Sequence, residues 1–474
     1  MPENSWPEND SYNVPDSLHD LLMEVSELSD SEVVPLYPSG EHRRRKAALV
    51  LALIWSSTLA LHVYVGGFWL ILGLTMVMGV HSLRLLIARP PKLPASLSWQ
   101  HPDPDVPRVS LLVAAKNEAA VIGALVKALC ELDYPRDRYE LWLIDDNSSD
   151  QTPTILDDLA KQYSQLRVLH RTAKDQGGKS GALNQVLPLT QGDIIGVFDA
   201  DAQVPPDLLR RVVPFFSEAQ LGAVQVRKAI TNYRTNFWTQ GQATEMALDT
   251  FFQQQRIAIG GIGELRGNGQ FVRRQALEAC GGWNEATITD DLDLTLRLHL
   301  NQWDIDFLPL PPVQEEGVTY FSALWHQRNR WAEGGYQRYL DYWPLMARNR
   351  LGPQKTFDLV MFWITQYGLP TAAVPDLLLA LVRQQVPLLA PVTSLTLALS
   401  FLGMLAGLNR IRRSQKLPFR PLSLVIQALQ GTVYMMHWFL VVASMTTRVA
   451  IRPKRLKWVK TMHQGEQDAQ WLAE

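Results

Sequence analysis

The chain of 474 residues is long enough for two or three domains. Its formal net charge of -2 gives no support for a nucleic-acid partner, which would require a basic surface. Two cysteines are too few for a disulfide framework. Apolar and polar residues are segregated into long blocks, so the chain is predicted to combine a water-soluble domain with membrane segments.

The N-terminal segment 1–42 is acidic and poor in apolar residues, and the first Lys or Arg of the chain is Arg43. A segment of this composition has too little apolar surface to fold alone, so we expect it to be disordered. It is not a signal peptide, because signal peptides begin with basic residues followed by an apolar run.

Segment 43–88 is predicted to form a transmembrane helical hairpin. Its two apolar runs, 47–65 and 68–87, are each about 20 residues long, which as helices matches the ~30 Å hydrocarbon core of a bilayer. Basic residues flank the pair on both outer sides, so the positive-inside rule places both ends in the cytoplasm. The alternative is a buried helical pair of a soluble protein. A Pro-rich linker, 89–107, follows the hairpin.

Segment 108–320 alternates short apolar runs typical of buried strands with amphipathic runs typical of helices. This alternation predicts a mainly parallel, Rossmann-like α/β sheet covered by helices. Ligands bind such sheets at the carboxyl ends of the strands, where polar clusters occur in this sequence. The predicted strands cover 108–118, 139–146, 166–170 and 194–198, and the predicted helices cover 118–132, 152–163 and 180–189.

Two carboxylates spaced two residues apart, Asp199 and Asp201, follow the predicted strand 194–198. Side chains at this spacing on an extended backbone point the same way, so both can offer oxygens to one ligand. A divalent cation such as Mg²⁺ or Mn²⁺, shared with phosphate oxygens, suits this arrangement. The alternative is an ordinary turn, but the position directly after a buried strand favours a metal site.

Two further polar groups are candidates for nucleotide binding. Asp145, in L-I-D-D-N-S-S-D, is placed to accept a hydrogen bond from a base or ribose, although a D-D turn also serves as a helix N-cap. Lys179 follows two glycines and opens a predicted helix, so a diphosphate could meet both its ammonium group and the helix N-terminus. The alternative for Lys179 is a flexible side chain in solvent.

An acidic cluster and an Arg/Trp cluster complete the candidate site. The sequence from Ile288 to Leu294 is I-T-D-D-L-D-L, in which a carboxylate held in a partly desolvated cleft can act as a general base. These acids can also simply stabilise a helix N-terminus. The sequence from Gln327 to Trp331 is Q-R-N-R-W, which offers guanidinium groups for phosphate and an indole face for a sugar or lipid headgroup. An Arg/Trp belt at a membrane interface is the alternative.

In this order, these features resemble the membrane-bound family 2 glycosyltransferases, which include the cellulose and hyaluronan synthases and several glycolipid synthases. The family pattern of a first Asp, D-x-D, T-[ED]-D and Q-x-x-R-W is matched between about Val109 and Trp331. The resemblance implies a GT-A fold that binds a UDP-sugar and a divalent metal ion, Mg²⁺ or Mn²⁺, and inverts the configuration at C1 of the sugar. One departure is Asp290, where the family more often has Glu.

The resemblance also implies roles for individual residues. Asp291 would be the catalytic base, Asp199 and Asp201 would bind the metal ion and the diphosphate, and Asp145 would contact uracil. The implied nucleotide-sugar site comprises Ala115, Glu118, Asp145, Lys179 and Asp199. The implied diphosphate and acceptor end comprises Asp290, Gln327, Arg328, Arg330 and Trp331.

The C-terminal part is predicted to return to the membrane. Segment 321–356 interleaves aromatic and basic residues, as an interfacial helix does. Segment 357–447 is predicted to be transmembrane, and a basic tail, 448–474, follows. Five membrane crossings, which we prefer, place this basic tail on the outer side of the membrane. If the first of the three C-terminal apolar runs instead lies at the interface, the basic loop 410–420 is on the outer side. Each topology therefore conflicts once with the positive-inside rule. The three apolar runs cover 357–382, which prolines interrupt, 388–408 and 422–447.

A lipid is the expected acceptor, because about five short apolar segments leave little room for a polymer channel. Within the family the chain is most similar to glycolipid synthases of photosynthetic bacteria that transfer glucose from UDP-glucose to the sn-3 hydroxyl of 1,2-diacylglycerol, giving a β-glucolipid on the way to galactolipids. The resemblance implies an integral protein of the thylakoid or plasma membrane with a cytoplasmic catalytic domain and no obligatory protein partner. No residue distinguishes glucose from galactose on physical grounds. A small polysaccharide synthase of the cellulose or hyaluronan synthase type is the alternative.

Overall fold

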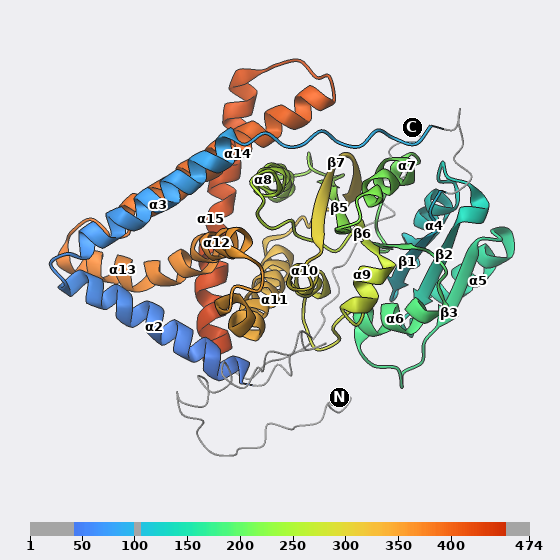
Figure 1. The fold of residues 1–474 in the computed structure, drawn as a ribbon, viewed down its shortest axis with the longest axis horizontal. Coiled ribbons are helices and arrows are strands. Elements are labelled where there is room, and N and C mark those ends of the chain that lie inside the picture. The colour runs from blue at the N-terminus through green and yellow to red at the C-terminus, as the bar shows by residue number, and fades with distance from the viewer. Residues whose placement is uncertain (1–41, 99–105, 452–474) are drawn as a thin grey trace.

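The computed structural model describes residues 42–98 and 106–451. A mixed sheet with its covering helices lies at one end of the molecule, and the long apolar helices lie at the other (Figure 1). The acidic segment 1–42 and the basic tail 448–474 fall almost entirely outside the described residues.

The sheet has seven strands in the order β3-β2-β1-β4-β6-β5-β7. Only β6 is antiparallel to its neighbours, so the prediction of a mainly parallel sheet is confirmed. The strands predicted at 166–170 and 194–198 are β3 and β4 with the same limits. The strands are β1 (Val109–Ala115), β2 (Tyr139–Asp145), β3 (Leu166–His170), β4 (Ile194–Phe198), β5 (Leu221–Ile230), β6 (Gln270–Arg273) and β7 (Asp304–Glu315).

Strand register brings the predicted polar clusters to one edge of the sheet. Ala115 at the end of β1 pairs with Asp145 at the end of β2, and Val113 pairs with Phe198 at the end of β4. The side chains of β1 and β4 are almost all buried, because helices cover both faces of the sheet. The helices of this region are α4 (Ile122–Cys130), α5 (Thr152–Gln162), α6 (Gly178–Val186), α7 (Leu208–Val212), α9 (Arg274–Ala279) and α10 (Asp290–Leu300), with 3-10 turns at Arg136–Arg138, Leu187–Leu189 and Val213–Ser217.

Three helices lie between the sheet and the apolar end of the molecule: α8 (Phe237–Ala258), α11 (Phe321–Ala347) and α12 (Pro353–Trp363) (Figure 1). Helix α11 carries the Q-R-N-R-W sequence. This middle layer contacts both the last strands of the sheet and the apolar helices, so it connects the site to the membrane part.

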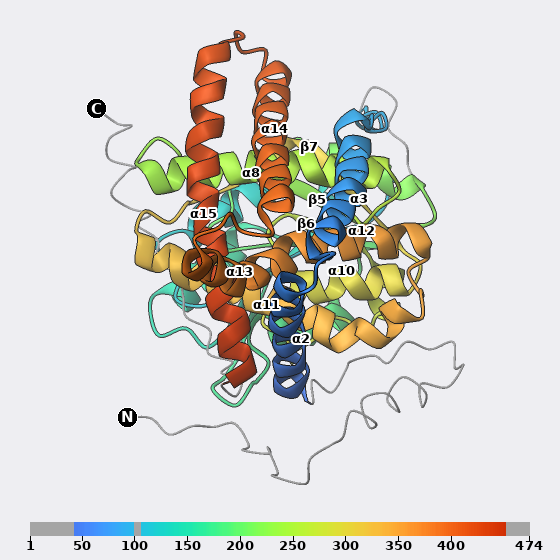
Figure 2. The ribbon, with the colours of Figure 1, turned by 90° about the vertical axis from the view of Figure 1, so that its left-hand side faces the viewer.

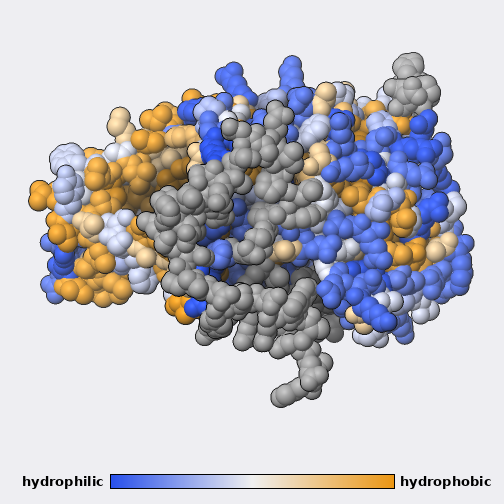
Figure 3. Space-filling view, turned by 60° about the horizontal axis from the view of Figure 1, so that its bottom comes forward, coloured by the Kyte–Doolittle hydropathy of each residue, from blue (hydrophilic) through white to orange (hydrophobic). Residues whose placement is uncertain are grey.

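Among the described residues, four helices are long and apolar enough to cross a membrane: α2 (Arg43–Val63), α3 (Gly67–Ile87), α14 (Ala390–Ser414) and α15 (Pro421–Ile451). The predicted hairpin is therefore present as α2 and α3, which diverge from their connecting turn (Figures 1 and 2). Apolar side chains gather over this end of the molecule, whereas the sheet end is polar (Figure 3).

The apolar run predicted at 357–382 is not one continuous helix. It consists of the end of α12, a π-helical turn (Ile364–Gly368) and α13 (Leu369–Arg383). Pro370 lacks the N–H that an α-helix needs to reach the carbonyl four residues earlier, which accounts for the break. The far end of α13 reaches the α2–α3 turn, where Arg383 Nη1 donates to the carbonyl of His62 at 3.2 Å.

Candidate active site

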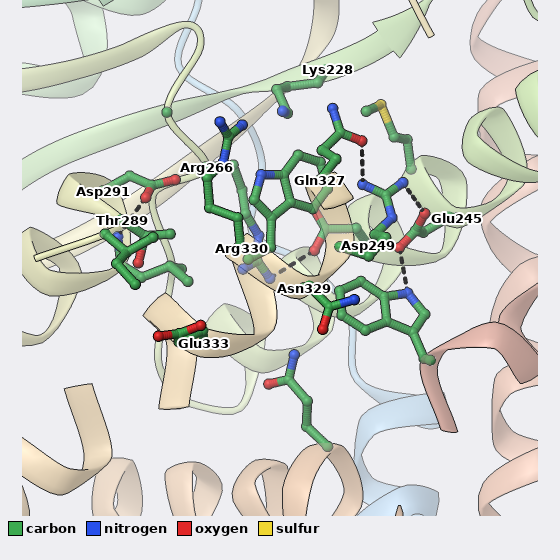
Figure 4. A pocket seen from close by; sticks show the side chains of 18 of the residues that line it. Lys228, Glu245, Asp249, Arg266, Thr289, Asp291, Gln327, Asn329, Arg330 and Glu333 are labelled. Carbon is green, nitrogen blue, oxygen red and sulfur yellow. Dashed lines mark hydrogen bonds and ion pairs between the residues drawn. The ribbon is translucent and has the colours of Figure 1, made fainter. Parts of the chain in front are cut away.

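One cavity of about 1620 Å³ lies at the carboxyl ends of β1 and β4 and continues to the membrane helices (Figure 4). Asp145 is the one candidate site residue from the sequence that does not line it. The candidates that line it are Ala115, Glu118, Lys179, Asp199, Asp201, Asp290, Asp291, Gln327, Arg328, Arg330 and Trp331.

The D-x-D carboxylates Asp199 and Asp201 follow β4 and face this cavity. Enclosure opposes ionisation of Asp199, but Lys179, with Nζ 2.5 Å from Asp199 Oδ1, outweighs it, so the pKa of Asp199 is lowered and the carboxylate is charged. No group of three or more His, Cys, Asp or Glu side chains in the described ranges is arranged to hold a metal ion. The pair still fits Mg²⁺ or Mn²⁺, because Mg²⁺ commonly takes one or two protein carboxylates and completes its shell with substrate phosphates and water.

Lys179 stands in the first turn of α6, directly after two glycines in the left-handed region. At Gly177, with φ of 84°, an added Cβ would lie 2.9 Å from the backbone Cα of Gly181, so a side chain would be strained there. Enclosure alone would lower the pKa of Lys179. The negative charges of Asp199 and, to a smaller extent, Asp290 outweigh this effect, so the pKa of Lys179 is raised above its usual range. The ammonium group is therefore charged and faces the cavity beside the N-terminus of α6.

The structure places Asp146, and not Asp145, in the cavity lining. Asp145 is buried; it accepts the Ser148 N–H at 3.1 Å and lies 3.0 Å from His170 Nδ1. Asp146 Oδ1 accepts from Arg171 Nη1 at 2.5 Å. Successive residues at a strand end face opposite sides, which separates the two acids of the D-D pair. The second acid of the D-D pair is therefore the one that lines the cavity, and the sequence alone did not distinguish the two neighbours.

Asp291 lies in the first turn of α10 and points into the cavity (Figure 4). Its carboxylate accepts its neighbour's N–H, from Leu292, at 2.9 Å. Enclosure and the adjacent Asp290 raise the pKa of Asp291 to about 6, against the opposing effects of the Leu292 N–H, Lys179 and Lys228. A carboxyl group with this pKa can accept a proton near neutral pH and hold it, as a general base must.

The two arginines of the Q-R-N-R-W sequence have different surroundings. The Arg328 guanidinium is buried and donates to Glu245 Oε2 at 2.6 Å and to Tyr434 OH at 3.2 Å. It also lies 4.1 Å from the ring centroid of Trp331, so it holds this indole in place. Arg328 also lines the cavity; its Nη2 is engaged by Glu245 and Tyr434, and its Nη1 donates to Gln327 Oε1 at 3.0 Å. Arg330 is the arginine of this pair whose charge interacts with Asp199 and Asp291.

Several cations that line the cavity were not among the residues expected from the sequence, and Lys228 and Arg266 are two of them. Lys228 on β5 forms an ion pair with Glu315 at 3.1 Å, and its Nζ lies 5.3 Å from the ring centroid of Trp331. Arg266 Nη2 lies 2.9 Å from Asp249 Oδ1 and also lines the cavity. The signal for Lys228 was a charged residue in an otherwise buried strand, which is costly unless the charge is paired.

Beyond Asp291 the cavity continues between the middle layer and the membrane helices. Its lining there includes the polar side chains of Ser82 on α3, Gln366 on the π-helical turn and Ser400 on α14, among apolar neighbours. The site is thus one continuous space that is strongly charged at the sheet and mostly neutral at the membrane helices.

Comparison with known proteins agrees with this architecture. Residues 107–334 match the family model described as glycosyltransferase like family 2. The chain is 60% identical over 470 residues to the beta-monoglucosyldiacylglycerol synthase of Trichormus variabilis, covering 98% of this chain and 99% of that protein. It belongs to glycosyltransferase family 2, among the beta-monoglucosyldiacylglycerol synthases. The synthase of the same name from Synechocystis sp. is 54% identical over 471 residues, covering 98% of this chain and 97% of the relative.

Among solved structures, the fold is similar to that of the mannosyltransferase PcManGT from Pyrobaculum calidifontis, determined in complex with GDP-Man and Mn²⁺. The TM-score is 0.52 at 20% sequence identity, and the match covers 83% of this chain and 99% of that one. The GT-A-like fold predicted for this family 2 member is therefore confirmed.

Proposed function

We propose that this chain transfers glucose from UDP-glucose to the sn-3 hydroxyl of 1,2-diacylglycerol and forms β-monoglucosyldiacylglycerol. The observation that carries the proposal is the full-length identity of 60% to a protein named for this product. The continuous cavity, which joins Asp199 and Asp291 to helices α3 and α14, supports a water-soluble donor and a lipid acceptor meeting at one site.

The donor is expected at the sheet end of the cavity. The uracil would lie near Ala115, Glu118 and Asp146, with the diphosphate between Lys179 and Arg330. All five residues line the cavity, and the two cationic side chains face it from opposite elements, α6 and α11. Charge-assisted bonds from such groups stabilise the diphosphate most when it carries the additional charge of a leaving group.

The transfer needs one general base. Asp291 accepts the proton of the acceptor hydroxyl, and the oxygen attacks C1 of glucose from the side opposite the diphosphate. The bond between C1 and the phosphate oxygen breaks, and its electron pair leaves with UDP, whose charge Lys179 and Arg330 help to neutralise. Because one displacement occurs at C1, the α-linked donor gives a β-linked product.

Asp199 and Asp201 would hold a divalent metal ion, Mg²⁺ or Mn²⁺, against the donor diphosphate. When bound, such an ion supplies Lewis-acid stabilisation of charge on phosphate oxygens. The lowered pKa of Asp199 supports this assignment, since a metal ligand must be deprotonated.

The catalytic domain is expected on the cytoplasmic face of the thylakoid or plasma membrane, where nucleotide sugars occur. Basic residues at the start of α2 and the end of α3 support this orientation through the positive-inside rule. The acceptor would then enter the cavity from the membrane helices while the donor enters from the aqueous side.

The proposal is tested with the purified full-length chain, Mg²⁺, diacylglycerol, and either labelled UDP-glucose or labelled UDP-galactose. A β-linked lipid with one glucose, formed from UDP-glucose alone, is the expected product. A galactolipid would overturn the donor assignment, and an insoluble polymer would instead identify a polysaccharide synthase. Binding of UDP-glucose without turnover would show that the site does not perform transfer.

A further inference from the structure

Helix α15 has the length and composition of a membrane-crossing helix, but its contacts do not match that role. We propose that α15 does not cross the membrane and instead lies along the membrane face on the side of the catalytic domain. Its exposed apolar side chains would contact the acyl chains of that leaflet. Three sets of contacts, at the middle, the start and the end of the helix, carry this inference.

The middle of α15 contacts the charged layer beside the active site. Tyr434 OH donates to Glu245 Oε2 at 3.1 Å, and Trp438 Nε1 donates to Glu245 Oε1 at 2.7 Å. Glu245, on α8, in turn binds Arg328 of the Q-R-N-R-W sequence at 2.6 Å. The centre of a membrane-crossing helix would lie in the middle of the hydrocarbon core, whereas the centre of α15 lies at the depth of the catalytic cavity that Glu245 and Arg328 line.

The start of α15 also lies on the catalytic side. Arg410, near the end of α14, donates to Gln254 at 2.6 Å and to Gln255 at 3.3 Å, both on α8. Gln255 donates to the carbonyl of Ala88 at 2.9 Å, at the end of α3 where the chain leaves the membrane for the catalytic domain. Because a short connection joins α14 to α15, the first turn of α15 lies at this same level.

The end of α15 returns to the same layer. Arg448 donates to Asn329 Oδ1 and to Glu333 Oε2 of α11, each at 3.1 Å. Arg43, the first residue of α2, pairs with Asp341 of that helix at 2.5 Å. A helix that crosses a bilayer separates its ends by about 30 Å in depth. The end of α15 is instead fixed to α11, and its start follows closely the end of α14, which is fixed to α8.

One face of α15 is exposed and apolar along most of its length. Leu422, Leu429, Val433, Met436 and Leu440 recur at helical spacing, with exposures of 73%, 52%, 64%, 51% and 57%. The opposite face, including Leu424, Ala428 and Val441, is buried against the protein. A continuous exposed stripe of large apolar residues marks a contact with hydrocarbon, and basic residues at both ends of the helix complement lipid phosphates.

An in-plane α15 removes the conflict with the positive-inside rule that both topologies considered from the sequence contain. The chain crosses with α2, returns with α3, crosses again through α12, the π-helical turn and α13, and returns with α14. Asp376 of α13 supports this path, because its carboxylate accepts the N–H groups of Leu388 and Leu389 beside the start of α14, at 2.8 and 3.1 Å. With α15 in the plane of the membrane, the basic loop 410–420 and Arg448 both lie on the cytoplasmic side, as the positive-inside rule requires.

The side of the membrane reached by each end is tested by single cysteines in the full-length chain in sealed vesicles. The native Cys130 and Cys280 are buried, which keeps background labelling by a membrane-impermeant maleimide low. We expect Lys416→Cys and Ile451→Cys to be labelled from the same face as a marker on the catalytic domain, Asp158→Cys. Val65→Cys, at the α2–α3 turn and 98% exposed, should be labelled from the opposite face. Labelling of positions 416 and 451 from opposite faces would overturn the proposal.

The depth of α15 is tested separately with a fluorophore attached at Val433→Cys in liposomes that contain brominated lipids. Bromines near the headgroup should quench this fluorophore more strongly than bromines near the chain ends. The matched control is Met76→Cys on α3, which is 73% exposed and should show the opposite order. Stronger quenching of position 433 by the deep bromines would show that α15 crosses the membrane. Neither experiment depends on enzymatic activity, so the result stands apart from the assigned function.

Discussion

The two ends of the catalytic cavity use charge in different ways. At the sheet end, Lys179, Asp199 and Asp291 face the cavity, where a ligand can reach them. At the membrane end, charged side chains form buried ion pairs: Arg256 Nη2 lies 2.9 Å from Asp358 Oδ2, and Arg338 Nη2 lies 2.8 Å from Glu264 Oε1. The first group is partly exposed to the cavity at the carboxyl ends of the strands, although Lys179 and Asp199 pair with each other, whereas the second group is buried and holds α8, α11 and α12 together.

This contrast predicts that a change at the sheet end alters catalysis and leaves stability nearly unchanged. Asp291→Asn should lower transfer by about 10²- to 10⁴-fold, because the amide cannot accept the proton of the acceptor hydroxyl. UDP binding should be retained, and the unfolding temperature should stay within a few degrees of the parent. Turnover, calorimetric UDP binding and thermal unfolding are measured together, with the exposed Asp158→Asn as the matched control. Loss of UDP binding equal to the loss of transfer would remove Asp291 from the role of base.

A change at the membrane end should do the reverse. Glu245→Gln leaves the buried Arg328 guanidinium without its carboxylate partner, which typically costs about 3–5 kcal/mol in the free energy of unfolding. The expected result is a much lower unfolding temperature in detergent, with UDP affinity preserved in the protein that remains folded. The control is again Asp158→Asn, since its exposed pair with Lys161 contributes at most about 1 kcal/mol. Equal unfolding temperatures for the two variants would contradict the contrast.

The D-x-D carboxylates give a smaller effect that depends on the metal ion. Asp201→Asn should weaken UDP binding in the presence of Mg²⁺ by at least about tenfold, since even outer groups around a metal site cost 10- to 100-fold. Removing Mg²⁺ with a chelator should weaken binding in the parent and have little further effect in the variant. Calorimetry with and without Mg²⁺ measures both. A variant that responds to the chelator as strongly as the parent would place the ion elsewhere.

The sequence predicted the sheet end better than the membrane end, for a physical reason. Strands β3 and β4 and the position of Asp199 follow from local patterns, because a buried parallel strand is a short apolar run with polar residues at its end. The choice between Asp145 and Asp146 depends on which way one side chain faces, and both neighbours have the same chemistry. The surroundings of Arg328 could not be predicted, because its partners Glu245 and Tyr434 are 83 and 106 residues away in the sequence.

The membrane end was harder because hydropathy reports composition and not direction. The run 422–447 is apolar enough to cross a membrane, and the residues that hold it against the catalytic layer lie on α8 and α11. Prolines in the run 357–382 did indicate a broken helix, since the effect of proline is local. The conflict with the positive-inside rule is the remaining signal in the sequence, and the in-plane orientation proposed for α15 would remove it.

The smallest effect concerns the pH dependence of the base. The pKa of Asp291 is raised to about 6, and only its deprotonated form accepts a proton, so activity should rise with pH and level off above about 6. Below that value the rate should fall by about tenfold per pH unit, as for a single titrating group. The profile of kcat/KM for UDP-glucose reports the free enzyme, whereas kcat reports the enzyme with both substrates bound. Added negative charge from the diphosphate raises the midpoint in the complex, and the bound cation lowers it, so the difference between the two profiles measures which charge Asp291 senses more strongly. A profile for kcat/KM that is flat between pH 5 and pH 8, with donor binding unchanged over this range, would show that the proton is accepted by another group.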